Sequence, residues 1–158
     1  ALLKLGVPLI VSHMFVFYFG IMADLTPPVA LAAFAAASIS KASPMKTGVK
    51  ATQIAIAGFV VPFIAIYDPS LMLQGSFGWT DVVYVSFKAL AAIVLWGATV
   101  VGFLRGPLSS LQRGLAFAAA ASLIAALPLT DEIGFALGAV VIGWNVWSSR
   151  SRPAPAVA

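Results

Sequence analysis

The sequence predicts an all-α, polytopic transmembrane protein that contains one broken (discontinuous) helix. The first observation is composition, because 61% of the 158 residues are hydrophobic and 9% are charged, whereas soluble globular domains carry about 25% charged residues. The second is a series of long apolar runs that lack the strand-type alternation of an outer-membrane barrel. The third is a polar, proline-containing interruption at residues 23–29, between two apolar runs.

Composition also excludes several classes of function. The chain has no cysteine, which excludes a disulfide framework and thiolate-based metal or redox chemistry. Its net charge of +4 does not indicate a nucleic-acid partner, because the basic residues cluster at the ends of apolar runs, as topology signals do. The chain begins inside an apolar stretch, without a signal-peptide pattern. We therefore expect it to be the C-terminal piece of a longer membrane protein.

The interruption reads Ala-Asp-Leu-Thr-Pro-Pro-Val and does not suit a continuous helix. Pro27 and Pro28 remove two backbone donors and clash with the preceding turn, and they push the residues before them toward extended geometry. The flanking apolar runs, 5–22 and 29–40, are each marginal for a bilayer that takes roughly 20 residues of helix to cross. We therefore predict one tilted, broken crossing over residues 5–40, with a re-entrant hairpin as the alternative.

Further apolar runs follow, and we predict helices over residues 51–67, 81–104, 115–127 and 133–147. The last two runs have only about 13 to 15 residues, which is short for a full span. Residues 41–50, 68–80 and 105–113 are expected to be loops. The tail at 150–158 is basic and then rich in proline and alanine, and is expected to be disordered.

The charges of the loops alternate in sign. Basic residues gather at 41–50, 105–113 and 150–152, and acidic residues gather at 68–81 and 131–132. An even number of crossings between like-charged segments would place all basic segments on one side of the membrane. The positive-inside rule then predicts that the basic loops and the C-terminus are cytoplasmic.

Asp24 and Thr26 are the first candidates for chemistry. An ionisable group at membrane depth is by default a functional hypothesis, and a carboxylate, a hydroxyl and free carbonyls together make an oxygen cage suited to a small cation. The positive end of the helix from Val29 favours an anionic substrate group. The alternative is that Asp24 or Thr26 only caps a helix that begins at Pro27 or Pro28.

Other polar residues in the apolar runs have simpler interpretations. His13 could bind substrate or carry a proton, but a single intramembrane histidine is more often a hydrogen-bonded packing residue. Lys88 is expected to extend its side chain to the membrane interface, and Thr52 and Gln53 are expected to lie at an interface. The pair Gly134 and Gly138 matches the small-x-x-x-small pattern of close helix contacts, although a glycine-rich chain gives that match little specificity.

The stretch His13–Phe34, with the core Thr-Pro-Pro-Val at 26–29, Gly20 upstream and an alanine-rich run downstream, resembles a known family. It is similar to the large membrane subunit of tripartite ATP-independent periplasmic (TRAP) transporters, most of all to the type in which the small and large membrane subunits are fused. The lysine-rich loop and the run Tyr-Asp-Pro-Ser-Leu at 67–71 fit as well. The resemblance extends from about Gly6 to Leu73 and weakens in the C-terminal helices.

The resemblance implies a sodium-coupled uptake system for organic anions in the bacterial cytoplasmic membrane, fed by a periplasmic substrate-binding protein. The fold it implies has inverted repeats and an elevator-type movement. Residues 1–73 would be the C-terminal part of a transport repeat, and 74–149 would be C-terminal transmembrane helices. Apart from sodium as the coupling ion it implies no metal or cofactor, and its partners would be the rest of the permease chain and the lipid bilayer.

The resemblance also assigns roles within the interruption. The carbonyls of Gly20 and Pro27 would bind the cation together with Thr26, beside the Asp24 that residue chemistry favours. Thr26, His13 and Pro28 would lie near the substrate.

Two hypotheses from other classes stay open at this point. One is a non-transporting membrane scaffold or assembly subunit. The small number of intramembrane charges supports it, and the polar interruption argues against it. An intramembrane enzyme would need Asp24 and His13 to approach within about 3 Å or through one water for general acid–base work. No nucleophile–base pair, metal cluster or phosphate loop supports an enzyme, so we expect none.

Overall fold

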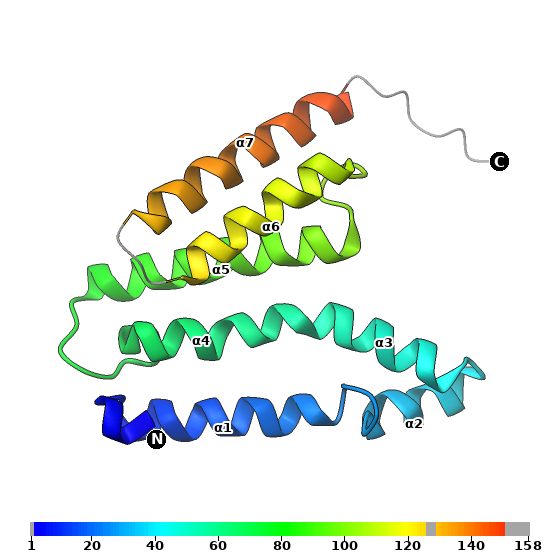
Figure 1. Ribbon diagram of the computed structural model, residues 1–158, viewed down its shortest axis with the longest axis horizontal. Coiled ribbons are helices and arrows are strands. Elements are labelled where there is room, and N and C mark those ends of the chain that lie inside the picture. Colours follow the sequence, from blue (N-terminus) through cyan, green and yellow to red (C-terminus); the bar gives the residue numbers. More distant parts are fainter. Residues whose placement is uncertain (1, 126–128, 151–158) are drawn as a thin grey trace.

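The computed structural model describes residues 2–125 and 129–150, and its helices run back and forth beside one another, each roughly antiparallel to the next layer (Figure 1). The α-helices are α1 Leu9–Ala23, α2 Leu31–Ser40, α3 Pro44–Ala55, α4 Val60–Tyr67, α5 Trp79–Val101, α6 Ser110–Ile124 and α7 Thr130–Arg150. Short 3₁₀ helices are η1 Leu2–Leu5, η2 Ile56–Phe59 and η3 Pro69–Met72. No β-strand occurs in these two ranges, which confirms the all-α prediction.

The broken helix forms one edge of the molecule, where α2 continues the line of α1 after an interruption (Figure 1). The next layer is a helical stretch over Pro44–Tyr67, which comprises α3, η2 and α4. This stretch has 24 residues and α5 has 23, and both are long and apolar enough to cross a membrane. Two spans of that length, with the shorter apolar helices α1 and α2 beside them, are consistent with the predicted polytopic membrane fold.

The predicted loop at 41–50 is wrong over most of its length, because α3 begins at Pro44. A proline is tolerated in the first turn of a helix, where its missing N–H has no partner in any case. The lysines that follow are good helix formers, so a segment with charges and a proline is still helical. The span predicted at 51–67 therefore starts earlier than expected.

The other boundaries also differ from the predictions. The helix predicted at 81–104 is α5, and it ends at Val101 because Gly102 adopts a left-handed conformation with φ 76°. The helix predicted at 115–127 is α6, and it begins at Ser110 because Ser109 and Gln112 form a reciprocal capping box. The basic loop is accordingly shorter than 105–113. The run predicted at 133–147 is the longer α7, and residues 151–158 of the predicted tail lie outside the described residues.

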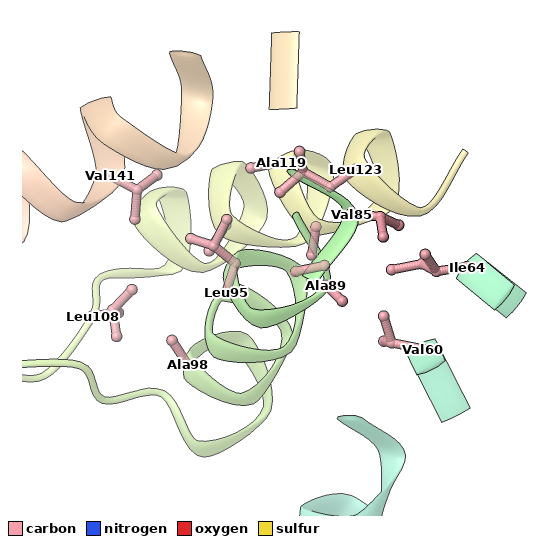
Figure 2. Close-up of a cluster of buried hydrophobic side chains, with 13 residues drawn as sticks. Val60, Ile64, Val85, Ala89, Leu95, Ala98, Leu108, Ala119, Leu123 and Val141 are labelled. Carbon is pink, nitrogen blue, oxygen red and sulfur yellow. The ribbon is translucent and has the colours of Figure 1, made fainter. Parts of the chain in front are cut away.

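The hydrophobic core lies among α4, α5, α6 and α7, with α5 at its centre (Figure 2). Its buried side chains are Val60, Ile64, Val85, Ala89, Ala92, Leu95, Ala98, Leu108, Ala116, Ala119, Ala120, Leu123 and Val141. Many are alanines, and small side chains let neighbouring helices approach closely. The pattern of Gly134 and Gly138 has the same effect. A methyl group added at Gly134 would lie 2.7 Å from Leu123, and one at Gly138 would lie 2.9 Å from Leu95.

The first half of the broken helix, α1, packs against η2 and α4 through aromatic rings. Phe15 and Phe19 of α1 pack against Phe63 of α4 with ring centroids 5.6 and 5.9 Å apart, both nearly edge to face. Phe19 also lies 5.3 Å from Phe59. Offset or edge-to-face aromatic pairs contribute about 1 kcal/mol each beyond the area they bury. This small cluster docks α1 on α4 without any polar contact.

Lys88 does not extend to the interface as predicted. It is 9% exposed, and its Nζ lies 2.6 Å from Asp131 Oδ1 at the start of α7. The Tyr84 hydroxyl donates a hydrogen bond of 2.8 Å to the other oxygen of Asp131. A nearby carboxylate on a second helix is a better partner for a buried ammonium than a distant interface, since an unpaired charge in the core is costly.

The outer surface of the helices is apolar. Large hydrophobic side chains are more than half exposed on every long helix, among them Val16, Leu31, Ile54, Phe87, Leu111 and Trp147. Soluble monomers rarely expose apolar area on this scale, so this surface suits lipid or further protein. The basic corner between α2 and α3, the α5–α6 loop and the end of α7 lie at one end of the molecule (Figure 1). The acidic segments around Asp68, Asp81 and Asp131 lie at the other end, together with Lys4.

Candidate functional site: the break between α1 and α2

The break extends from Asp24 to Ala30, between the end of α1 and the start of α2. It forms where the sequence has two consecutive prolines, and the peptide bond between Pro27 and Pro28 is cis. The backbone N–H of Asp24 still bonds to Ile21 O, so α1 ends in an ordinary last turn. Leu25 N–H and Thr26 N–H also donate to Met22 O, and the prolines that follow have no N–H with which to continue the helix.

Hydrogen bonds fold the break into a compact turn. Ala30 N–H donates to Thr26 O at 3.0 Å and to Ala23 O at 3.2 Å. Two residues further on, Ala32 N–H donates to Asp24 O at 3.1 Å. Because the chain after the prolines bonds back to the chain before them, α1 and α2 are held in a defined relation rather than joined by a loose linker.

α3 packs directly against this turn. The Thr52 hydroxyl lies within hydrogen-bond distance of Leu25 O, at 3.2 Å, and of Gly48 O, at 2.9 Å. Gly48 is buried, and a methyl group built on it would lie 3.0 Å from Pro27 and 3.3 Å from Phe34. Glycine thus permits the closest approach of α3 to the break.

Sequence reasoning missed both residues of α3. It placed Thr52 at a membrane interface and treated Gly48 as a loop former, whereas both lie in α3 and contact the break. The available signal was their spacing, since positions four apart lie on one face of a helix. That signal requires knowing that residues 44–55 form a helix, which Pro44 and the lysines there obscured.

Several oxygen atoms of the break are available as ligands. The Thr26 hydroxyl donates to Met22 O at 3.1 Å and retains its lone pairs. Among the described residues, no hydrogen bond ends on the carbonyl oxygens of Pro27, Pro28 or Val29. The break therefore gathers one hydroxyl and several carbonyls whose acceptor capacity the fold leaves unused.

The interpretation of Asp24 or Thr26 as a mere helix cap is wrong. α2 begins at Leu31, its N-cap residue is Ala30, and no side chain caps it. The Asp24 side chain is exposed beside the turn, and the Thr26 hydroxyl points back to α1. Neither polar side chain makes a capping hydrogen bond to the start of α2.

The remaining predicted site residues lie on α1. Gly20 is exposed one turn before the break. His13 is also exposed, with its Nδ1 2.8 Å from Leu9 O, and it lies eleven positions before Asp24 along α1, which is roughly 16 Å at 1.5 Å per residue. The structure thus brings Asp24, Thr26, Pro27 and Pro28 into one turn and leaves His13 apart. The contact that an Asp24–His13 enzyme would need is not made.

A helix that is interrupted by a turn with unused carbonyls, beside helices long enough to cross a bilayer, is typical of one class of protein, the secondary membrane transporters. The comparison with protein families agrees, since residues 1–80 match the model described as "Tripartite ATP-independent periplasmic transporter, DctM component". The chain therefore belongs to this family of TRAP transporter large membrane components. Neither the curated proteins nor the solved structures include a match to the chain.

Proposed function

We propose that this chain is part of a permease that takes up organic acids by coupling to a cation, most simply Na⁺. The observation that carries the proposal is the turn at 24–30, in which Thr26 and the unused carbonyls of Pro27 and Pro28 lie together. Unwound backbone carbonyls at a broken membrane helix are the usual ligands for a coupling Na⁺ in secondary transporters.

Within this proposal the cation ligands are the carbonyl of Pro27, the Thr26 oxygen and the neighbouring Asp24 carboxylate, with Gly20 one turn away. Thr26 and Pro28 also face the substrate side, and His13 reaches the substrate from α1. A site of this kind is completed by other segments of the permease, because the oxygens of one turn provide only part of a coordination sphere.

The proposed setting follows from the family. TRAP large components work with a periplasmic binding protein and a small membrane subunit, and we propose the same partners here, beside the rest of the permease. The chain would lie in the bacterial inner membrane, with its basic end and C-terminus in the cytoplasm. Membership in a transporter family favours this function over a non-transporting scaffold and over an enzyme.

The test is Na⁺-dependent uptake by the complete permease with its binding protein, reconstituted in vesicles. Thr26→Ala should abolish the dependence on Na⁺ or raise the Na⁺ concentration for half-maximal uptake at least tenfold, while Thr26→Ser, which keeps the hydroxyl, should retain it. Thr99→Ala is the matched control, since the Thr99 hydroxyl makes the same type of hydrogen bond, 2.9 Å to Leu95 O, but lies on α5. Unchanged Na⁺ dependence in Thr26→Ala would refute the assignment.

The same vesicles test the other coupling ion. Uptake that follows a pH gradient without Na⁺, and that is lost in Asp24→Asn or His13→Gln, would replace the sodium site with a proton relay. Uptake that survives replacement of residues 24–28 by leucine and alanine would favour the scaffold interpretation instead.

A further inference from the structure

An open apolar groove lies between α4 and α6. Its volume is about 560 Å³. The residues that line it are Phe59, Val60, Phe63, Tyr67, Trp96, Phe117, Ala121, Ile124 and Ala125. Trp96 comes from α5, between the two walls, so the groove has an aromatic floor and aromatic sides.

A basic residue lies one helical turn beyond this groove. The rings of Trp96 and Phe117 are 5.2 Å apart and form one contact between α5 and α6. The next contact along the same two helices is Arg113 Nε, which donates to Thr99 O at 2.9 Å. Residues three or four apart share a helix face, so Arg113 lies on the groove side of α6, toward the basic end of the molecule.

The guanidinium of Arg113 has capacity for a further ligand. The side chain is exposed, and one of its five N–H groups bonds to Thr99 O. The ion pair described within residues 2–125 and 129–150 is that of Lys88 with Asp131, and it does not involve Arg113. A planar guanidinium that is held by Nε and keeps its outer N–H groups free matches a phosphate well.

We propose that this surface binds one anionic phospholipid of the cytoplasmic leaflet. Its phosphate contacts Arg113, and one acyl chain lies in the groove along Trp96 and Phe117. The charge of the arginine at one mouth complements a lipid phosphate, and the apolar walls complement a hydrocarbon chain. Trp96, Arg113 and Phe117 lie beyond residues 1–80, so the matched family model covers only the α4 wall of this site.

The size of the groove favours a lipid chain over a helix of a partner protein. A helix about 10 Å across fills roughly 400 Å³ in each turn of 5.4 Å, so a groove of about 560 Å³ accepts little more than one turn. A flexible hydrocarbon chain fills a narrow apolar groove of this volume without displacing α4 or α6.

The proposal is tested with the complete permease in vesicles that contain a phosphatidylglycerol with a photoreactive acyl chain, or a phosphatidylcholine with the same chain. After illumination, peptide mass spectrometry locates the labelled residues. Labelling within residues 59–67 and 117–125 should be at least fivefold stronger with phosphatidylglycerol. Arg113→Gln should reduce it to the phosphatidylcholine level, and Arg105→Gln, an exposed arginine in the neighbouring loop, should leave it unchanged.

Other results would overturn the proposal. Equal labelling by the two lipids would remove the preference for an anionic headgroup, because both lipids carry a phosphate. Full preference in Arg113→Gln would remove the contact with Arg113. A photoreactive amino acid at Ala121 that reacts with another protein segment instead of lipid would show that a helix occupies the groove. Equal melting temperatures of Arg113→Gln and the parent protein in phosphatidylcholine would confirm that loss of labelling is not loss of fold.

Discussion

At the scale of single residues, two side chains of α3 determine how closely the break is held. Gly48 has almost no space for a side chain, and the Thr52 hydroxyl bonds across to Leu25 O. The positions of the oxygens proposed as ligands therefore depend on Gly48 and Thr52, although neither residue is charged and neither is itself proposed as a ligand.

Gly48→Leu should displace the break, because the added side chain would overlap Pro27 and Phe34. Overpacking of a tight contact costs about 1–3 kcal/mol, and a loss of 1.4 kcal/mol in cation binding corresponds to about a tenfold weaker site. We expect the Na⁺ concentration for half-maximal uptake to rise about tenfold. Gly114→Leu is the control, since a Cβ built on that glycine of α6 meets no atom within 4 Å. Equal uptake curves for the two variants would contradict the role of Gly48.

Asn145 is a second uncharged residue with a large predicted effect. It is fully buried in α7, and its Oδ1 accepts from Arg105 N at 3.1 Å and from Gly106 N at 3.2 Å, which fixes the α5–α6 loop. Asn145→Ala would leave these donors without a partner, at about 1–3 kcal/mol for each buried group. We expect a clear fall in the melting temperature of the purified permease. Ser148→Ala, which removes only a hydrogen bond within α7, should change it little.

At the scale of helices, the pair of Lys88 and Asp131 connects α5 to α7. Removal of one partner of a buried pair leaves an uncompensated charge and costs about 3–5 kcal/mol, whereas removal of both is often nearly neutral. Lys88→Met and Asp131→Leu should each destabilise the protein strongly, and the double variant should recover most of the loss. Denaturation of all four proteins in one detergent measures this coupling, with Glu132→Gln as the exposed neighbouring control. If the losses of unfolding free energy in the two single variants added up to the loss in the double variant, the interaction between Lys88 and Asp131 would contribute nothing to stability.

The sequence was sufficient to predict the helical class, the broken helix and its polar turn, because consecutive prolines between apolar runs act locally. It was not sufficient for the start of α3, where lysines and a proline resemble a loop although they suit the first turns of a helix. The partner of Lys88 lies on another helix, and the contacts of Gly48 and Thr52 cross from α3 to the break. Such contacts depend on how the helices pack against one another, and no local sequence pattern predicts that packing.

At the scale of the whole molecule, the basic and acidic segments lie at opposite ends (Figure 1). The orientation is tested with single cysteines, which are convenient because the chain has none of its own. In an otherwise cysteine-free permease, Ser43→Cys at the basic corner should react with a membrane-impermeant maleimide only after the cells are permeabilised. Ser76→Cys in the α4–α5 loop should react in intact cells. The reverse pattern would invert the orientation.

The separation of charge between the two ends also has an electrical consequence. Moving one elementary charge through a potential of 100 mV changes the energy by about 2.3 kcal/mol, and a cell interior that is negative attracts the end that carries Lys41, Lys46 and Arg105. Inverting the chain would carry these cations outward and the carboxylates of Asp68 and Asp81 inward, so each charge would move against the electrical force that acts on it. A membrane potential of this sign would thus also favour the proposed orientation of the chain.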